Sequence, residues 1–231
     1  MHEHSTSRGI PRRLLIQAAG ISLCGAIATS LPGCSLGVMF GKMVMGEPLV
    51  PADFRQMTRE DLMKGKHTVL VVCKAPNHVD ADNSTLSYDL IDGVTRRMKL
   101  NGIKVINPDH VASWVDEHGG VGIDPTELAE EFDPDYVVVI DVQSFSYREP
   151  NSPKMLRGQA AGFVRAYEVT KIEGHHRVNN VFVSEFHSTY PKHQPLQEEQ
   201  RSSIVFQKEY MDRFCDALAQ KFYDHRPGTD F

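Results

Sequence analysis

DYVVVIDVQSFSY, residues 135–147, is the strongest strand signal of the chain, because β-branched and aromatic side chains dominate it. Two prolines predict a turn over residues 148–154, and residues 156–170 follow as a partner strand. A polar turn over residues 171–180 leads to a third strand, residues 181–189. Three successive strands joined by turns predict an antiparallel meander.

Upstream of the meander, the sequence predicts a strand–helix–strand unit with parallel strands. HTVLVVC, residues 67–73, has the apolar, β-branched character of a buried strand. Residues 84–100 place apolar side chains at four-residue steps, as one face of a helix does, and residues 103–106 form the second strand. Two shorter helices are expected to begin at Asn107 and Asp124.

The C-terminal part, residues 200–223, predicts a long amphipathic helix that packs on the meander. Its apolar stripe consists of Phe206, Tyr210, Phe214, Leu218 and Phe222. The order of elements predicts an α/β (α+β) fold: a single domain with a mixed sheet, a βαβ start, an antiparallel three-strand meander and a packed C-terminal helix.

The composition excludes some function classes. The 231 residues carry a formal net charge of −5, which disfavours nucleic acid as a partner because phosphate binding needs a basic face. The four cysteines are Cys24, Cys34, Cys73 and Cys215. The last two lie in apolar strand and helix contexts and are predicted to be buried free thiols, with a disulfide as the alternative in an oxidising compartment.

The N-terminus has the three-part form of an export signal. Three arginines precede the apolar run of residues 14–31, and Gly33 comes directly before Cys34. The run contains Gln, Ser, Thr and Gly, and a transmembrane span needs about 20 predominantly apolar residues. A cleaved signal is therefore favoured, and a retained membrane anchor remains the alternative.

Leu31-Pro32-Gly33-Cys34 resembles the lipobox of bacterial lipoproteins, with Pro32 departing from the usual Ala or Ser. The resemblance implies cleavage between Gly33 and Cys34 and attachment of fatty acyl chains, such as palmitate, to Cys34. Two or more such chains exceed what stable membrane attachment needs. Arg12-Arg13 also resembles a twin-arginine signal, and both this route and Sec export stay open.

The predicted organisation follows from this anchor. Residues 1–33 are the signal peptide, 34–57 the lipid anchor and tether, 58–224 the globular domain and 225–231 a tail. Ser35 stands where an Asp would favour inner-membrane retention in enteric bacteria, so the analogy favours the outer membrane.

Several acidic residues are candidates for catalytic groups. Asp133 and Asp135 precede the strand of residues 135–147, and Asp141 interrupts its apolar run. A paired-carboxylate site needs two of them in one cleft, and turn and edge positions are the favoured interpretation. Asp109 is interpreted as a favourable charge at a helix start, near His110 and Asp116.

The histidines and glycines give no stronger signal. His175 and His176 lie in a predicted turn beside Glu173, where solvent exposure is favoured over metal binding. His187 and His193 could join them only if the fold brought them near. Gly158 and Gly162 are predicted to allow a bulge or a close helix approach, and not to cradle a phosphate.

The common catalytic motifs are absent from the sequence: G-x-S-x-G, the P-loop, G-x-G-x-x-G after a strand and H-E-x-x-H. The sequence therefore predicts no catalytic residue, no cofactor and no metal. An enzyme whose catalytic residues lie far apart in the sequence would show no such motif.

The globular part is similar, in pattern, to the α/β lipoprotein domains of the curli-secretion type, of penicillin-binding-protein activators and of the TolB amino-terminal domain. ELAEEFDPDYVVVIDV, residues 127–142, carries this resemblance. GCSLGVMFGKMVMGEP, residues 33–48, resembles the anchor and tether of uncharacterised planctomycete-type envelope lipoproteins.

The sequence thus predicts a membrane-anchored cell-envelope lipoprotein on the periplasmic side. Its role would be non-enzymatic, in structure, assembly or protein interaction, with an envelope protein or a second copy as partner. One alternative is a small-ligand-binding or transport-accessory lipoprotein, which needs a concave apolar pocket. Another is an envelope polymer hydrolase, which needs facing carboxylates or a His–carboxylate pair across a cleft.

Overall fold

The computed structural model describes residues 49–118 and 123–227, all within the compact unit Leu49–Phe231. The predicted signal peptide, the lipobox and most of the tether lie outside the described residues. So do residues 119–122.

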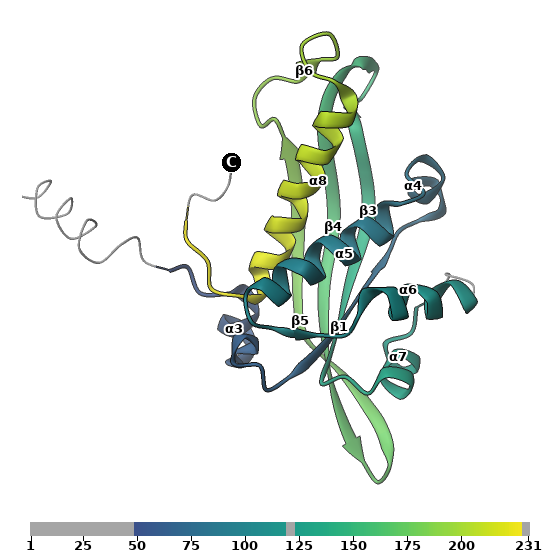
Figure 1. The fold of residues 1–231 in the computed structure, drawn as a ribbon, viewed down its shortest axis with the longest axis vertical. Coiled ribbons are helices and arrows are strands. Elements are labelled where there is room, and N and C mark those ends of the chain that lie inside the picture. Colours follow the sequence, from purple (N-terminus) through teal and green to yellow (C-terminus); the bar gives the residue numbers. More distant parts are fainter. Residues whose placement is uncertain (1–48, 119–122, 228–231) are drawn as a thin grey trace, which may run out of the picture. The chain divides into compact units, whose positions relative to one another are not determined.

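One mixed sheet organises this unit (Figure 1). Its strands are β1 (Thr68–Lys74), β2 (Lys104–Val105), β3 (Tyr136–Glu149), β4 (Ser152–Ile172), β5 (His175–Tyr190) and β6 (Leu196–Gln197). The order is β2-β1-β3-β4-β5, and β6 pairs with β4. β1 is parallel to β2 and to β3, whereas β3, β4 and β5 are antiparallel to their neighbours. The predicted βαβ start and meander are confirmed.

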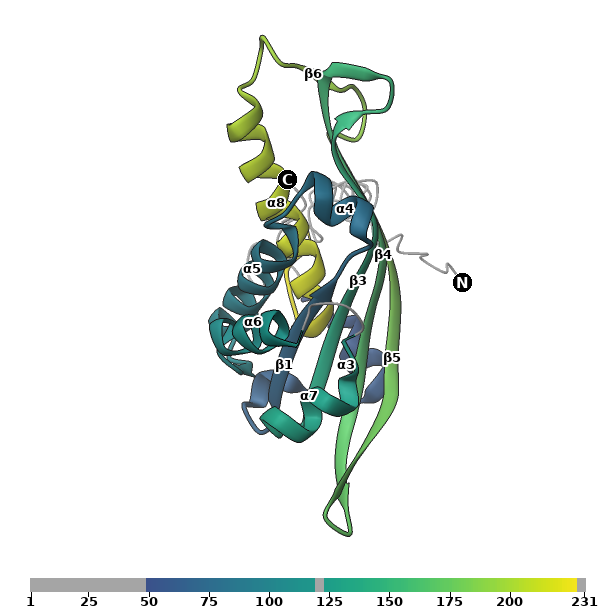
Figure 2. The same ribbon diagram turned by 90° about the vertical axis from the view of Figure 1, so that its right-hand side faces the viewer.

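Helices cover both faces of the sheet. They are α3 (Asp53–Thr58), α4 (Asn77–Asp82), α5 (Leu86–Leu100), α6 (Pro108–Glu117), α7 (Pro125–Phe132) and α8 (Ser203–Ala219), with short 3-10 turns η1 (Leu62–Lys64) and η2 (Gln220–Phe222). Helices α5 and α8 lie side by side on one face (Figure 1). The β4–β5 hairpin extends past the helices at one end (Figure 2).

The alternation of β1 and β3 side chains divides the core between the two faces. Val69, Val71 and Cys73 point to the larger core, which α3, α5 and α8 close. Leu70 and Val72 point to a smaller core, which α6 and α7 close through Val111, Trp114, Leu128 and Phe132. Because β1 and β3 are buried on both faces, their sequences are nearly continuous apolar runs.

Helix α8 packs on the meander, as the sequence predicts. The rings of Phe206, Tyr210 and Phe214 stack along the helix, and the Phe214 ring centroid lies 5.4 Å from that of Phe186 in β5. Gly158 makes this packing possible, because a Cβ there would lie 2.3 Å from the Tyr210 ring. The predicted close helix approach at Gly158 is confirmed.

The β4–β5 hairpin differs from the prediction of a ten-residue polar turn. β4 continues to Ile172 and β5 begins at His175, so only Glu173 and Gly174 form the turn. Both have positive φ, 52° and 84°, which is typical of the two-residue turn whose twist matches the strands. The two strands therefore pair over polar residues that the hydrophobic pattern does not mark.

Two short helices were also missed. Helix α4 lies between the predicted strand of residues 67–73 and the predicted helix of residues 84–100, where the hydrophobic pattern marks no element, and α3 lies in the segment assigned to the tether. Phe54 of α3 is 1% exposed and contacts the rings of Tyr136, Phe182 and Phe222. The packed domain thus includes residues before position 58.

The two ends of the described chain meet. Val50 and His225 exchange two backbone hydrogen bonds of 2.7 and 3.0 Å. Next to them, the Asp224 carboxylate accepts from the Ala52 backbone N–H and pairs with Arg55. These contacts hold the start of α3 against the segment that follows α8.

Candidate functional site

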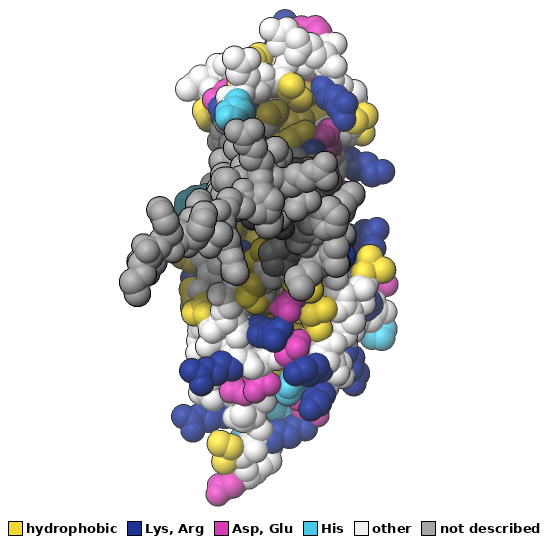
Figure 3. Space-filling view, turned by 90° about the vertical axis from the view of Figure 1, so that its left-hand side faces the viewer, with side chains coloured by type: hydrophobic (Ala, Val, Ile, Leu, Met, Phe, Trp, Pro, Cys, Tyr) yellow, Lys and Arg dark blue, Asp and Glu magenta, His cyan; other side chains and the backbone are white. Residues whose placement is uncertain are grey.

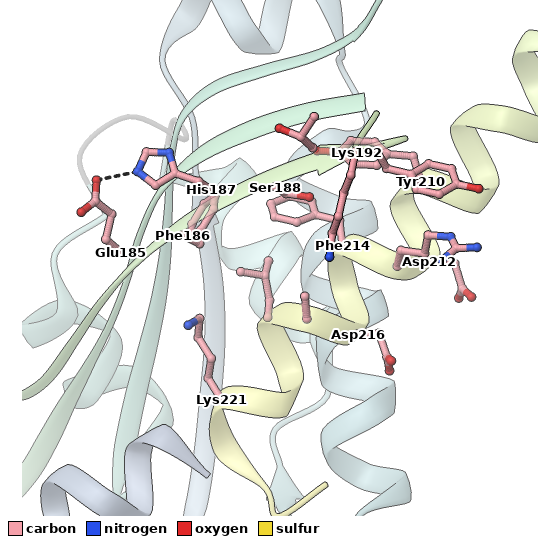
Figure 4. A pocket seen from close by; sticks show the side chains of 15 residues that line it. Glu185, Phe186, His187, Ser188, Lys192, Tyr210, Asp212, Phe214, Asp216 and Lys221 are labelled. Atoms are coloured by element: carbon pink, nitrogen blue, oxygen red, sulfur yellow. Dashed lines mark hydrogen bonds and ion pairs between the residues drawn. The ribbon is translucent and has the colours of Figure 1, made fainter. Parts of the chain in front are cut away.

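An open groove of about 430 Å³ runs between strand β5 and helix α8 (Figure 4). Residues 185–190 form its strand side, and Tyr210, Arg213, Phe214, Ala217 and Lys221 are among the helix residues that line it. Phe186 and Phe214 close its floor, where both are buried. The groove therefore combines an apolar floor with charged side chains above it.

Helix α8 follows β5 along the whole groove, in the opposite chain direction. Phe182 contacts Phe222, Ser184 accepts a 2.9 Å hydrogen bond from Lys221, and Tyr190 stacks on Phe206. Side chains at alternate positions of β5 thus point towards the helix. Between them, Glu185 and His187 point to the other face and form a 2.8 Å contact with each other (Figure 4).

At the upper end of the groove, three side chains donate hydrogen bonds to one carboxylate, that of Glu209. Glu209 accepts hydrogen bonds from the Tyr190 hydroxyl at 2.7 Å, from Arg201 at 2.6 Å and from Arg213 at 3.3 Å. These donors lower the pKa of the Glu209 carboxyl below its ordinary value, the Tyr190 hydroxyl most strongly. The Arg213 guanidinium also lies 4.3 Å from the centroid of the Tyr190 ring, a cation–π distance.

Strand β5 is an edge of the sheet. Its only strand partner among the described residues is β4, so the backbone groups on its other side pair with no strand of the described part of the chain. At sixteen residues it is also long for an edge strand. Natural proteins keep exposed edges short or covered, since unpaired edges bind other chains.

A second open groove, of about 610 Å³, lies between α5 and α8. Arg97 spans it by pairing with Asp212 and, at 3.2 Å, with Asp216. Gly93 lets the helices approach, because a Cβ there would lie 2.5 Å from the Cys215 sulfur. Burial raises the pKa of Tyr147, which lines this groove, to about 12.

The acidic residues considered from the sequence have structural partners, as the turn-and-edge interpretation predicts. Asp133 has a left-handed backbone after α7 and contacts Lys171 and His176 at 2.5 and 3.1 Å, which lower its pKa, Lys171 most strongly. Asp135 accepts a 2.6 Å hydrogen bond from the Thr68 backbone. Asp141 pairs with Arg165 and Lys74. They form no shared carboxylate site.

Asp109 lies in the first turn of α6, where the sequence places it, and accepts a hydrogen bond from the Tyr88 hydroxyl at 3.2 Å. His175 and His176 begin β5 and do not lie in a turn. His187 contacts Glu185 and not these histidines. Within residues 49–118 and 123–227, no three His, Cys, Asp or Glu side chains are placed to hold a metal ion.

Cys73 and Cys215 are buried and form no disulfide, in agreement with the prediction. Gly33 and Cys34, the predicted cleavage and lipid-attachment residues, lie outside the described part of the chain. None of the helices in the described part is long and apolar enough to cross a membrane. On the face that Figure 3 shows, Lys and Arg side chains lie among Asp and Glu side chains over the lower half.

Sequence reasoning did not find the β5–α8 groove. The apolar stripe of α8 indicated which side packs on the sheet, but the neighbouring residues Arg213, Ala217 and Lys221 share no motif. Their four-residue spacing is the one signal that places them on a single side of the helix.

Comparisons with known proteins add the following. No protein-family model matches the chain, and a search of curated proteins finds no match. Among solved structures, lipoprotein GNA1162 from Neisseria meningitidis is similar at 13% sequence identity and a TM-score of 0.37, with 66% of this chain and 98% of that chain covered.

Two further solved structures are similar to a comparable degree. The hypothetical protein CT253 from Chlamydia trachomatis has 12% identity and a TM-score of 0.40, covering 68% of this chain and 97% of its own. The PelC dodecamer from Paraburkholderia phytofirmans has 12% identity and a TM-score of 0.36, covering 70% and 91%.

Proposed function

We propose that this chain is a lipid-anchored lipoprotein of the cell envelope whose domain binds another envelope protein and has no enzymatic activity. The observation that carries the proposal is the open groove beside the unpaired edge of β5. An unpaired edge next to a concave surface offers backbone hydrogen bonds and side-chain pockets to the same partner.

The anchor part of the proposal rests on the sequence. The lipobox-like residues 31–34 supply Cys34 as the attachment point for acyl chains, and Ser35 favours the outer membrane. Each buried methylene contributes about 0.8 kcal/mol, so two or three chains hold a water-soluble domain at the membrane. The domain would then face the periplasm.

A binding role also agrees with the contacts of the acidic residues. Asp133, Asp135 and Asp141 are each engaged in contacts that stabilise the fold. Glu185 and His187 are the His–carboxylate pair beside the groove, but they are neighbours on one strand and do not face each other across a cleft. Ser188 points to the opposite face from His187, so these residues form no nucleophile–base pair.

The proposal is tested with a photo-cross-linking amino acid placed in the intact lipoprotein in cells. Thr189 is exposed on the edge strand beside the groove, with its side chain on the face away from α8, so a cross-linker there reaches a partner that pairs with β5; Lys104, exposed on the short edge strand β2, is the matched control. We expect an adduct of defined mass from position 189 and none from position 104. The adduct should disappear with Cys34→Ala, because the domain then loses its place at the membrane.

The opposite outcomes contradict the proposal. Equal adducts from both positions would indicate unspecific contact. Absence of any adduct from position 189 would leave the groove without a protein partner in the cell.

Small-ligand binding is the second candidate, since the α5–α8 groove has a volume typical of ligand sites. Arg96, Arg97 and Lys208 line it together with Asp89, Asp92 and Asp212, which suits a polar ligand better than an apolar one. Protection of Arg97 from phenylglyoxal by a co-purified polar ligand would support this candidate. Unchanged modification after exhaustive dialysis would oppose it.

A further inference from the structure

The edge of β5 has the geometry to accept one more strand. Backbone N–H and C=O groups alternate along an edge, and an extended segment can pair with them at a spacing of about 4.8 Å between strands. Such a segment would lie next to the free edge of β5. Its side chains on the α8 face of the sheet would then point towards the side of the helix that lines the groove. The residues that line the groove there are Arg213, Ala217 and Lys221.

The spacing of these three residues matches an extended chain. Arg213 and Lys221 are eight residues apart on one helix, which corresponds to about 12 Å along its axis. Four residues of a strand span about 13 Å. Positions i and i+4 of an added strand would therefore lie opposite Arg213 and Lys221, and position i+2 would lie opposite Ala217.

The charges of the groove favour an acidic segment. Arg213 has its Nε and Nη1 atoms buried without a hydrogen-bond partner among the described residues. Lys221 contacts Asp53 and Ser184, which leaves one of its three N–H groups for another acceptor. The acidic groups Asp212 and Asp216, by contrast, are both paired with Arg97. The groove thus has spare donors, and both of these acids already have a basic partner.

We propose that β5 binds an extended segment of a partner protein by strand addition, and that this segment carries acidic side chains at positions i and i+4 with a small side chain at i+2. The carboxylates bind Arg213 and Lys221, and the small side chain fits beside Ala217. Backbone pairing supplies affinity and the two charges supply register.

The strand β5 of a second copy does not meet this requirement. The β5 side chains that point towards α8 are Phe182, Ser184, Phe186, Ser188 and Tyr190. None of them is acidic, and Glu185 points to the other face. A partner with a different strand is therefore the better complement.

This inference rests on the proposed function and specifies its binding mode. The test uses the full-length lipidated protein in detergent and a fluorescent, capped ten-residue peptide. In the peptide, Glu, Ala and Glu occupy alternate positions between threonines. We expect binding, measured by fluorescence anisotropy, to be at least tenfold tighter than for the same peptide with Lys in place of Glu. Hydrogen exchange should slow at β5 amides when the acidic peptide binds.

Variants separate charge recognition from folding. Arg213→Gln should weaken binding of the acidic peptide about tenfold, whereas Arg148→Gln, which replaces a half-buried arginine on β3 that is ion-paired with Glu198 and lines neither groove, should leave it unchanged. Arg213→Glu should reverse the preference and favour the lysine peptide. N-methylation of alternate peptide amides on one edge should abolish binding, because it removes the backbone donors that pair with β5.

Several results would overturn the inference. These are equal binding of both peptides, binding that survives N-methylation on either edge, and β5 amides whose exchange is unaffected. Displacement of the acidic peptide by phosphatidylglycerol micelles at equal concentration would assign the cations to a lipid headgroup instead. Cross-links from position 189 into a second copy, or into the chain's own residues 35–48, would also contradict it. If position 189 still cross-links another protein while the peptide fails, only the binding mode is wrong.

Discussion

The Tyr190 hydroxyl donates a 2.7 Å hydrogen bond to the Glu209 carboxylate and so joins the last residue of β5 to helix α8. Arg213 stacks on the same Tyr190 ring and contacts the same carboxylate. One acidic side chain therefore holds both the end of the edge strand and the arginine that lines the groove. The position of the groove wall depends on the charge of Glu209.

We predict that Glu209→Gln lowers the free energy of unfolding by about 1 kcal/mol, since an amide is a weaker acceptor for Tyr190 and two arginines. The pKa of Glu209 is lowered in the folded protein, so its stabilisation is complete above its ordinary value of 4.5 and is lost as the pH falls below it. Urea unfolding at pH 7 and below pH 4.5 measures both effects.

The matched control for this variant is Glu198→Gln, which removes an exposed carboxylate paired with Arg148. Its effect should be smaller, because exposed pairs contribute little. An equal loss of stability in the two variants would show that the Glu209 cluster has no special role.

Gly158→Ala is predicted to destabilise the domain by about 1–3 kcal/mol, through overpacking against the Tyr210 ring. The neighbouring side chain Gln159 points to the opposite face and is half-buried, so Gln159→Ala is the control and should change stability far less. Thermal and urea unfolding measure the difference. A neutral Gly158→Ala would mean that α8 can move away from β4 at no cost.

Cys215 is predicted to resist alkylation in the native protein. Burial raises the pKa of its thiol to about 12, and the thiolate is the reactive form. Iodoacetamide at pH 8, followed by peptide mass spectrometry, should label Cys215 only after denaturant is added. Rapid native labelling at this cysteine would show that α5 and α8 separate readily.

Cys34→Ala is predicted to abolish both fatty-acid labelling and membrane retention. Metabolic labelling with an alkyne fatty acid and membrane fractionation compare it with the unchanged protein, and Cys24→Ala serves as the control. If Cys34→Ala remains in the membrane fraction and the unchanged protein takes up no label, the anchor lies elsewhere. An unmodified N-terminus upstream of Cys34 in the purified protein would lead to the same conclusion.

Much of the fold could be predicted from local pattern, because β1 and β3 are buried on both faces and α5 and α8 on one side. The polar part of the β4–β5 hairpin could not, since its residues pair through the backbone alone and follow no hydrophobic alternation. Helix α3 was missed because its contribution to the core is a single side chain, Phe54.

The candidate site could not be predicted from the sequence, because it too depends on contacts that local pattern does not show. Whether a strand is an edge depends on the order of strands in the sheet, and this order is set by contacts distant in sequence. The turn and strand positions of Asp133, Asp135 and Asp141 could be predicted from the sequence, and each has a backbone or basic partner there. That Arg213 and Lys221 line a groove became evident only from their position beside β5 in the structure.

The paired backbones of Val50 and His225 have a mechanical consequence. Force entering the domain at Leu49 reaches these two hydrogen bonds first, and it is then shared with Asp224 and the Arg55 side chain. A force applied to the domain at its amino end is therefore shared with the segment that follows α8. Unfolding of α3 under such a force requires these contacts with the carboxyl end to break as well.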